Sequence, residues 1–96
     1  IPGPIWGHVG AGNFHATLLI RENNEEDQNI AKGIIHRMCE RCLELEGTIT
    51  GEHGIGMGKL RYMQDEHGDG WEIMSQIKRT LDPNYILNPG KVIKSK

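Results

Sequence analysis

The order of the expected elements places this sequence in the α+β class, with helices laid on one face of a mostly antiparallel sheet. Two strand-like segments come first, at residues 4–9 and 13–20, and a glycine-rich break separates them. An amphipathic helix is predicted next, at residues 24–46, and short extended segments then alternate with helical ones. The fold class follows from this order, β-β-α-β-α-β.

The first two segments predict a hairpin, because the Gly-Ala-Gly-Asn break at residues 10–13 lies between them. If Ala11 and Gly12 are the two loop residues, His8 lies directly opposite His15. Side chains opposite one another in an antiparallel pair have Cβ atoms roughly 4.5–5.5 Å apart. Two imidazoles at that separation are close enough to share one ligand or metal ion.

The long helix at residues 24–46 is predicted from its cap and its apolar stripe. Asn23 or Asn24 can cap its first turn, where acidic side chains favour the positive end of the helix dipole. Gly47 is a natural residue to follow its last turn, and Gly33 inside it is expected to mark close packing. The stripe repeats with helical spacing at Ile30, Ile34, Met38 and Leu45.

The two cysteines of the chain, Cys39 and Cys42, form a C-x-x-C pair inside this helix. Such a pair can indicate a redox or zinc site. No second pair completes a zinc site, and both positions fall on the apolar face of the helix. Because a cysteine there behaves as a small hydrophobe, the pattern favours packing.

The C-terminal half predicts a short strand at residues 48–50, a short helix at 59–66, a clearer helix at 70–82 and an extended segment at 86–93. The clearer helix ends at Asp82, because the residue before a proline avoids helical dihedral angles. Its apolar residues recur at helical spacing at Ile73, Ile77 and Leu81.

The segment GTITGEHGIGMGK, residues 47–59, carries the strongest functional signal. Glycines at this density cost conformational entropy, so they indicate unusual backbone dihedrals or the close approach of a ligand. Glu52 and His53 lie among them, and neighbours in an extended backbone point to opposite sides, which predicts different tasks for the two. Lys59 or Arg61, just downstream, could hold the carboxylate of a substrate.

Taken together, His8, His15 and Glu52 would give two neutral imidazoles and a carboxylate, a ligand set found in catalytic zinc sites. His53 would then be available as a general base. The alternative is that the two histidines merely pair across a sheet and Glu52 caps a turn. Spacing alone leaves both interpretations open.

Composition excludes some classes of function. A net charge of −2 gives no electrostatic footprint for nucleic acid. No apolar run approaches the roughly 18–20 residues of a membrane span, so no transmembrane segment is expected. With 36% hydrophobic and 5% aromatic residues the core would be thin for a free-standing domain, and the first residue is not Met. We therefore expect a piece of a longer protein.

Three motifs carry a family resemblance: GHVGAGNFH at residues 7–15, GTITGEHGIGMGK at 47–59 and LDPNYILNPGKV at 81–92. In this order and at these distances they resemble the C-terminal part of the FAD-linked oxidases of the vanillyl-alcohol oxidase type. The nearest branch looks like D-lactate dehydrogenase (cytochrome), with glycolate oxidase and D-2-hydroxyglutarate dehydrogenase as relatives. The resemblance runs from Gly7 to Val92.

The resemblance implies that residues 1–96 are the C-terminal part of a ferredoxin-like cap, or substrate, domain, and that the FAD-binding domain is absent from this chain. The whole protein would oxidise a small D-2-hydroxy acid, D-lactate first, to the 2-oxo acid with hydride transfer to FAD. Electrons would pass to cytochrome c, a quinone or an electron-transfer flavoprotein. A mitochondrial matrix or inner-membrane face and a bacterial cytoplasm would both fit. The fragment alone would turn over nothing.

The resemblance also implies roles for individual residues. His53 matches the base that takes the hydroxyl proton, and Lys59 remains the candidate for the substrate carboxylate. Asn13 lies in the motif near substrate and flavin, and Asn88 matches the final loop that returns toward the cofactor. A divalent metal, with zinc as the expected ion, would be held by three residues: His8, His15 and Glu52.

One departure from the family pattern concerns Ala11, because the family usually reads Gly-Asp-Gly-Asn where this chain reads Gly-Ala-Gly-Asn. The missing carboxylate could support the turn or the surroundings of the metal. We expect the fold to survive this change. Two alternatives remain: a non-catalytic metal-binding or interaction module of ferredoxin-like fold, and an oxidase of the same fold acting on an aldonolactone or a phenol.

Overall fold

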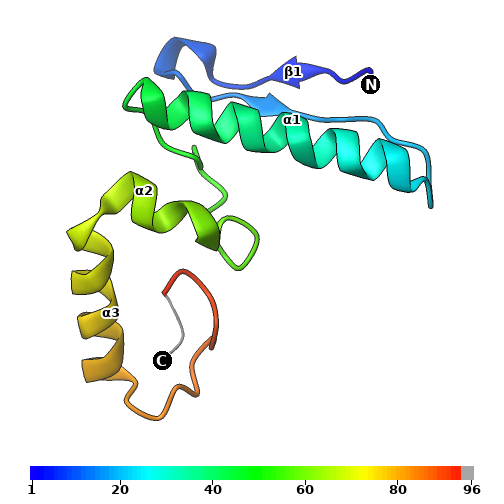
Figure 1. Ribbon diagram of the computed structural model, residues 1–96. Coiled ribbons are helices and arrows are strands. Elements are labelled where there is room, and N and C mark those ends of the chain that lie inside the picture. Colours follow the sequence, from blue (N-terminus) through cyan, green and yellow to red (C-terminus); the bar gives the residue numbers. More distant parts are fainter. Residues whose placement is uncertain (94–96) are drawn as a thin grey trace. The chain divides into compact units, whose positions relative to one another are not determined.

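The structure is a computed structural model in which residues 1–93 are described, and the chain divides into two compact units, Ile1–Gly47 and Thr48–Lys96. The first unit contains β1 (Ile5–Trp6), the 3-10 turn η1 (Val9–Ala11), β2 (His15–Ala16) and α1 (Glu25–Glu44), as Figure 1 shows. The second contains η2 (Leu60–Tyr62), α2 (Met63–His67) and α3 (Asp69–Leu81). The α+β prediction is confirmed, with an antiparallel sheet of two strands.

The antiparallel ribbon of the first unit differs from the predicted hairpin in length and register. Ile5 pairs with Ala16, and Trp6 pairs with His15. Backbone hydrogen bonds continue the ribbon on its open side, from the N–H groups of residues 17 and 19 to the carbonyls of residues 4 and 2, at 3.1 and 2.9 Å. The prediction that His8 lies opposite His15 is therefore wrong.

The physical reason lies in the turn. A two-residue hairpin turn of the expected type needs a positive φ at both central positions. Ala11 instead belongs to a 3-10 turn in which its N–H donates to the carbonyl of His8 at 2.9 Å. Gly12 follows at φ 78°, and the Asn13 N–H also donates to His8, at 3.2 Å. The connection is consequently longer than two residues.

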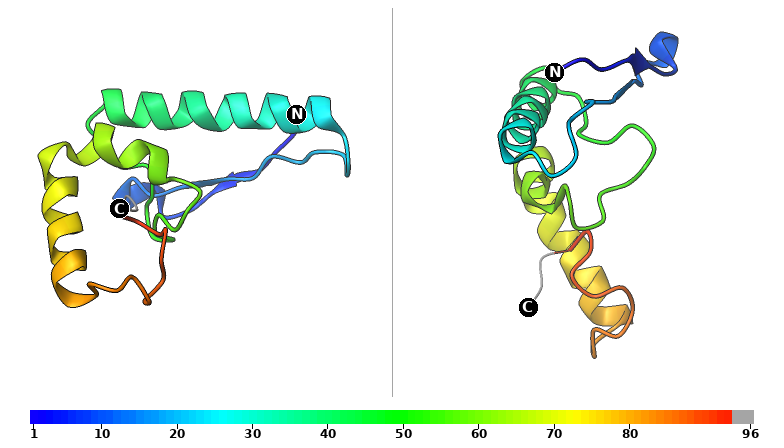
Figure 2. Two further views of the ribbon diagram at one scale, coloured as in Figure 1. Left: turned by 60° about the horizontal axis from the view of Figure 1, so that its bottom comes forward. Right: turned by 90° about the vertical axis from the view of Figure 1, so that its right-hand side faces the viewer.

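The long helix α1 is confirmed, with the cap expected from the sequence. The side chain of Asn24 accepts a hydrogen bond from the Asp27 N–H at 2.9 Å. Cys39 is buried and Cys42 half-buried, in keeping with packing. Gly33 does not mark close packing, because a Cβ built there meets nothing within 4 Å. Figures 1 and 2 show α1 running antiparallel to the segment that leads into it from β2.

The two predicted helices of the second unit are confirmed, whereas the two predicted strands are not. No strand forms at residues 48–50 or 86–93: the backbone bends at residue 49 and bends or turns through residues 87–93. Asn88 and Val92 have positive φ angles of 44° and 62°. Met63 (2% exposed) and Tyr62 (3%) are the most buried apolar residues described.

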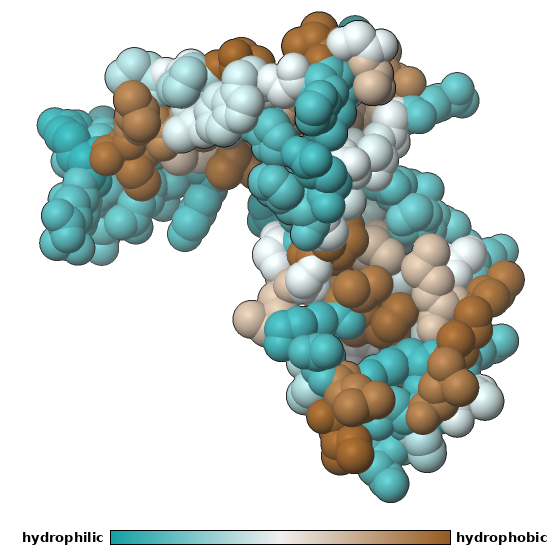
Figure 3. All heavy atoms as spheres, turned by 180° about the vertical axis from the view of Figure 1, so that it is seen from behind, coloured by the Kyte–Doolittle hydropathy of each residue, from teal (hydrophilic) through white to brown (hydrophobic). Residues whose placement is uncertain are grey.

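The stripe of α3 at Ile73, Ile77 and Leu81 is exposed, and Figure 3 shows apolar side chains at the surface of this unit. None of the helices over residues 1–93 is long and apolar enough to cross a membrane.

Candidate functional site

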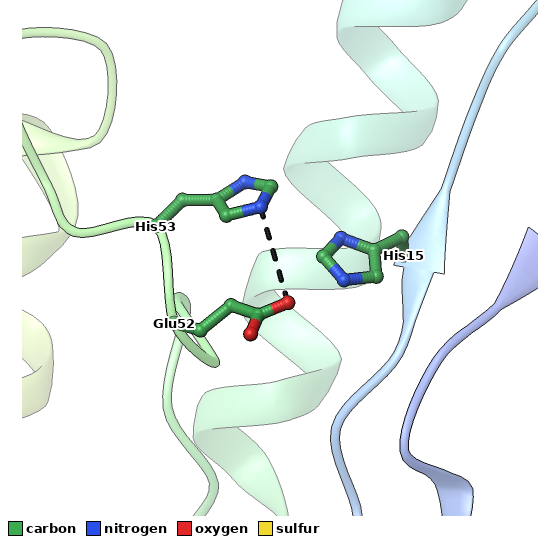
Figure 4. A group of neighbouring side chains, drawn as sticks. All are labelled: His15, Glu52 and His53. Atoms are coloured by element: carbon green, nitrogen blue, oxygen red, sulfur yellow. Dashed lines mark ion pairs between the residues drawn. The ribbon is translucent and has the colours of Figure 1, made fainter.

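Glu52 and His53 lie on the glycine-rich loop of the second unit, and the structure brings their side chains together. A Glu52 carboxylate oxygen lies 4.0 Å from Nε2 of His53, with the two side chains 44% and 74% exposed (Figure 4). The prediction that they point to opposite sides is wrong, because the backbone bends at residues 51–53 and the alternation of an extended strand does not apply. A carboxylate and an imidazole are thus presented side by side to solvent.

The start of this loop is fixed by side chains, not by a sheet. The Ile49 N–H donates to the carboxylate of Glu66 at 2.9 Å, and the Thr48 hydroxyl donates to the same carboxylate at 2.9 and 3.1 Å. On its other side Ile49 accepts a hydrogen bond from the Lys59 ammonium at 2.7 Å. Ile49 itself is buried, so its backbone groups need these partners.

The rest of the loop has two further fixed points. The Gly54 N–H donates to the Thr50 hydroxyl at 3.0 Å, and the Gly56 carbonyl accepts from the Val92 N–H at 2.9 Å. The Val92 carbonyl in turn accepts from the indole N–H of Trp71 on α3 at 2.9 Å. Gly54 and Gly56 have φ angles of 89° and 55°, which residues with a Cβ rarely adopt. The prediction of unusual dihedrals is therefore confirmed for Gly54 and Gly56.

The two candidate carboxylate binders occupy different environments. Lys59 is half-buried, and its bond to Ile49 engages one of the three donors of its ammonium group. Arg61 is exposed, with its guanidinium 4.9 Å from the centre of the Tyr62 ring. Lys59 therefore combines a structural contact with further hydrogen-bonding capacity.

The remaining predicted ligands lie in the first unit. His15, which is labelled in Figure 4 and projects from β2, is half-buried and stacks on Trp6, with ring centroids 5.4 Å apart and planes at 24°. His8 is exposed, and its carbonyl closes the 3-10 turn. Asn13 is half-buried directly after that turn. The ribbon thus pairs His15 with an indole, a contact that the hairpin interpretation missed.

Asn88, the predicted cofactor-side residue, lies in the loop after α3, which Asp82 organises. The buried carboxylate of Asp82 accepts a hydrogen bond from the Lys78 ammonium. It also accepts one from each of the backbone N–H groups of Ile86 and Leu87, both at 3.0 Å. The Lys78 hydrogen bond, with the two backbone donors, holds the pKa of Asp82 below its usual range despite burial. Asn88 directly follows this bonded segment and is exposed.

Sequence reasoning missed Glu66 and the bonding of Asp82. A signal for Asp82 was available, because aspartate at a helix end before proline often hydrogen-bonds the backbone N–H groups that follow. Glu66 carried no such signal, since its partners lie 17 and 18 residues away along the chain.

A carboxylate and an imidazole on a fixed glycine-rich loop, within an α+β fold, are features typical of a ligand-binding part of an enzyme. The pattern of the family described as FAD linked oxidases, C-terminal domain, matches residues 4–92. The chain belongs to this family, which confirms the resemblance expected from the three motifs.

Curated relatives agree with this assignment. The chain is 45% identical over 90 residues to "D-lactate dehydrogenase [cytochrome], mitochondrial" of Arabidopsis thaliana, which covers 93% of the chain and 16% of the relative. It is 43% identical over 94 residues to "Probable D-lactate dehydrogenase, mitochondrial" of Danio rerio (97% and 19%). It is 38% identical over 88 residues to "Glycolate oxidase subunit GlcD" of Bacillus subtilis (91% and 19%). The chain therefore spans less than a fifth of the length of each of these relatives.

Proposed function

We propose that the full-length protein is a flavin-dependent dehydrogenase that oxidises a small D-2-hydroxy acid to the 2-oxo acid, with D-lactate as the first choice. The family match over residues 4–92 is the observation that carries this proposal. The names of the relatives support it, since they include D-lactate dehydrogenases and a D-2-hydroxyglutarate dehydrogenase. Residues 1–96 would be part of the cap domain, and FAD would be bound mainly by segments outside this chain.

The donor groups of the chain fit a divalent cation. Imidazole and carboxylate are ligand types that zinc and manganese accept, and they are offered by His8, His15 and Glu52. When bound, FAD would accept the hydride from the substrate, and the cation would hold the substrate's carboxylate and hydroxyl oxygens. Glu52 is exposed enough for its carboxylate to reach such a cation.

His53 would accept the hydroxyl proton of the substrate at an imidazole nitrogen. Its exposure leaves the ring accessible, and the carboxylate of Glu52 lies 4.0 Å from its Nε2. Lys59 would direct its remaining donors to the substrate carboxylate, while Asn13 and Asn88 would lie toward substrate and flavin. The roles of His53, Asn13 and Asn88 are carried over from the motifs. The role of Lys59 rests on its charge and its place just after the glycine-rich loop.

The same comparison supports proposals for the electron acceptor and the compartment. A cytochrome is the first candidate acceptor, because it appears in the names of several relatives. A quinone or an electron-transfer flavoprotein is the alternative. Relatives named as mitochondrial and a bacterial GlcD fit a mitochondrial or a bacterial location equally.

The test of the reaction is anaerobic mixing of the full-length protein with D-lactate or L-lactate while the absorbance of oxidised flavin is followed. We expect bleaching by the D-isomer only, lost on chelation and restored by zinc or manganese. Bound flavin that no 2-hydroxy acid bleaches would show that the substrate class is wrong. Absence of flavin from the purified protein would favour the non-catalytic module instead.

The role of His53 is tested by His53→Ala, which should lower turnover by about 10²–10⁴-fold, the usual contribution of a general base. Metal content should be unchanged, because His53 is not among the proposed ligands. His36→Ala is the matched control, since it removes another exposed imidazole that is paired with a carboxylate, that of Glu40 at 2.8 Å. If the His53→Ala variant keeps its turnover, the proposal that His53 is the general base is wrong.

A further inference from the structure

The loop that carries Glu52 and His53 begins at residues 48 and 49, which form hydrogen bonds with the side chains of Glu66 and Lys59. The carboxylate of Glu66 accepts the Ile49 N–H and the Thr48 hydroxyl, and the Lys59 ammonium donates to the Ile49 carbonyl. Among residues 48–93 the segment has no strand partner. Its position therefore depends on these side chains, three residues before Glu52.

Glu66 is well placed for this task, because it is held in the packed part of the unit. It lies on α2 one turn after Met63, which is 2% exposed, and residues three apart share a helix face. The Glu66 side chain is itself only 13% exposed. Hydrogen bonds to a carboxylate are stronger than those between neutral groups, and low exposure reduces competition from water.

We propose that Glu66 is a positioning residue that fixes the Glu52–His53 loop in the geometry needed for proton transfer; the catalytic consequence rests on the proposed function. Glu66 bonds residues 48 and 49, and its Oε2 also lies 3.2 Å from Nε2 of His67. It acts on Glu52 and His53 only through the backbone that joins them to residues 48 and 49. Loss of its carboxylate leaves a buried N–H without its acceptor and releases the start of the loop. A displacement of about 1 Å at a catalytic group can cost about 10²-fold in rate.

The experiment compares Glu66→Ala, Glu66→Gln and the control Asp65→Ala in the full-length protein. Asp65 is the exposed neighbour on the same helix, so its removal changes the charge equally. One Glu66 oxygen, Oε1, lies 3.1 Å from the Thr48 hydroxyl and 2.9 Å from the Ile49 N–H, so a glutamine carbonyl can accept both bonds. Two readouts are used: amide hydrogen exchange of the 48–58 peptide, and kcat and KM with D-lactate.

We expect Glu66→Ala to speed exchange in residues 48–58 while α3 exchanges as in the wild type, and to lower kcat by roughly 10–100-fold. Glu66→Gln should restore both readouts to near wild type, and Asp65→Ala should leave both unchanged. A merely structural role would predict faster exchange across α3 as well. If Glu66→Ala does not fold, Thr48→Val, which removes one donor and keeps the carboxylate, should give a smaller change confined to the same peptide.

Three results would overturn the inference: unchanged exchange at residues 48–58 in Glu66→Ala, exchange raised equally in α3, or equal loss of kcat in Glu66→Gln. Failure of the proposed function gives a different result. In that case the wild-type protein turns over no 2-hydroxy acid, while the exchange comparison still decides whether Glu66 fixes the loop.

Discussion

Gly7 is a position in the connection beside the proposed ligands where the backbone leaves no room for a methyl group. Its φ is +149°, and a Cβ built there would lie 2.6 Å from both the Asn13 carbonyl oxygen and the Phe14 Cα. Both neighbours are backbone atoms, so no side chain can rotate away. Because ordinary contact begins near 3.4 Å, the Gly7→Ala variant must move the backbone at residue 7 away from residues 13 and 14 by about 0.8 Å.

The cost of Gly7→Ala has two parts. A residue with a Cβ held at an unfavourable φ costs about 1–3 kcal/mol, and overpacking against fixed atoms costs about 1–3 kcal/mol. We therefore expect destabilisation of about 2–6 kcal/mol. Gly10→Ala is the matched control, because Gly10 lies in the same connection and its Cβ would meet nothing within 4 Å. That variant should be neutral or stabilising by up to about 1 kcal/mol.

The assay is equilibrium urea unfolding of the full-length protein and both variants, with amide hydrogen exchange of residues 5–16 to localise the effect. Gly7→Ala should lower the transition midpoint and speed exchange across the ribbon, and Gly10→Ala should do neither. Equal effects of the two substitutions, or a neutral Gly7→Ala, would refute the reasoning from close approach. The comparison does not depend on the proposed activity.

Three other variants test further features of the structure. Gly33→Ala should stabilise α1 by about 1 kcal/mol in urea unfolding, because a methyl group there enters open space and lowers the entropy cost of the helix. Asn24→Ala should cost about 0.5–2 kcal/mol in the same assay, since it removes the cap bonded to the Asp27 N–H. The pKa of Asp82 is lowered in the folded state, so its ion pair with Lys78 stabilises the fold above the ordinary aspartate range, near 3.9, and is lost as pH falls through the folded pKa. Acid unfolding should show this contribution in the wild type below about pH 4, and Asp82→Asn should lack it.

The helices could be predicted from the sequence because their signals are local. The Asn24 cap, the acidic first turn of α1 and the end of α3 before Pro83 each act within a few residues. The predicted strands at 48–50 and 86–93 failed for the opposite reason. Thr48 and Ile49 are β-branched and resemble a strand in sequence, but their hydrogen bonds go to the Glu66 side chain. Local pattern does not show which partner a backbone group will find.

The site was predicted in part, with the same division between local and distant causes. The glycine density around Glu52 and His53 indicated an unusual loop, and the positive φ angles of Gly54 and Gly56 confirm that. The direction of the two side chains was predicted from strand alternation and was wrong, because the backbone bends there. The predicted register of the ribbon was wrong because a 3-10 turn makes the connection longer than two residues. As a result Trp6, and not His8, lies opposite His15.

That 3-10 turn also bears on the departure from the family pattern at Ala11. The turn is closed by backbone groups alone, through the N–H groups of residues 11, 12 and 13 and the carbonyls of His8 and Val9. Ala11 is exposed, so a side chain at this position is not needed to form the turn. A carboxylate there would instead add negative charge close in sequence to the imidazole of His8, where it could strengthen a bound cation. The alanine is thus compatible with the fold of the connection, unlike a methyl group at Gly7, which would meet backbone atoms of residues 13 and 14. If the proposed cation binds, we expect an effect of Ala11 on activity to act through cation affinity.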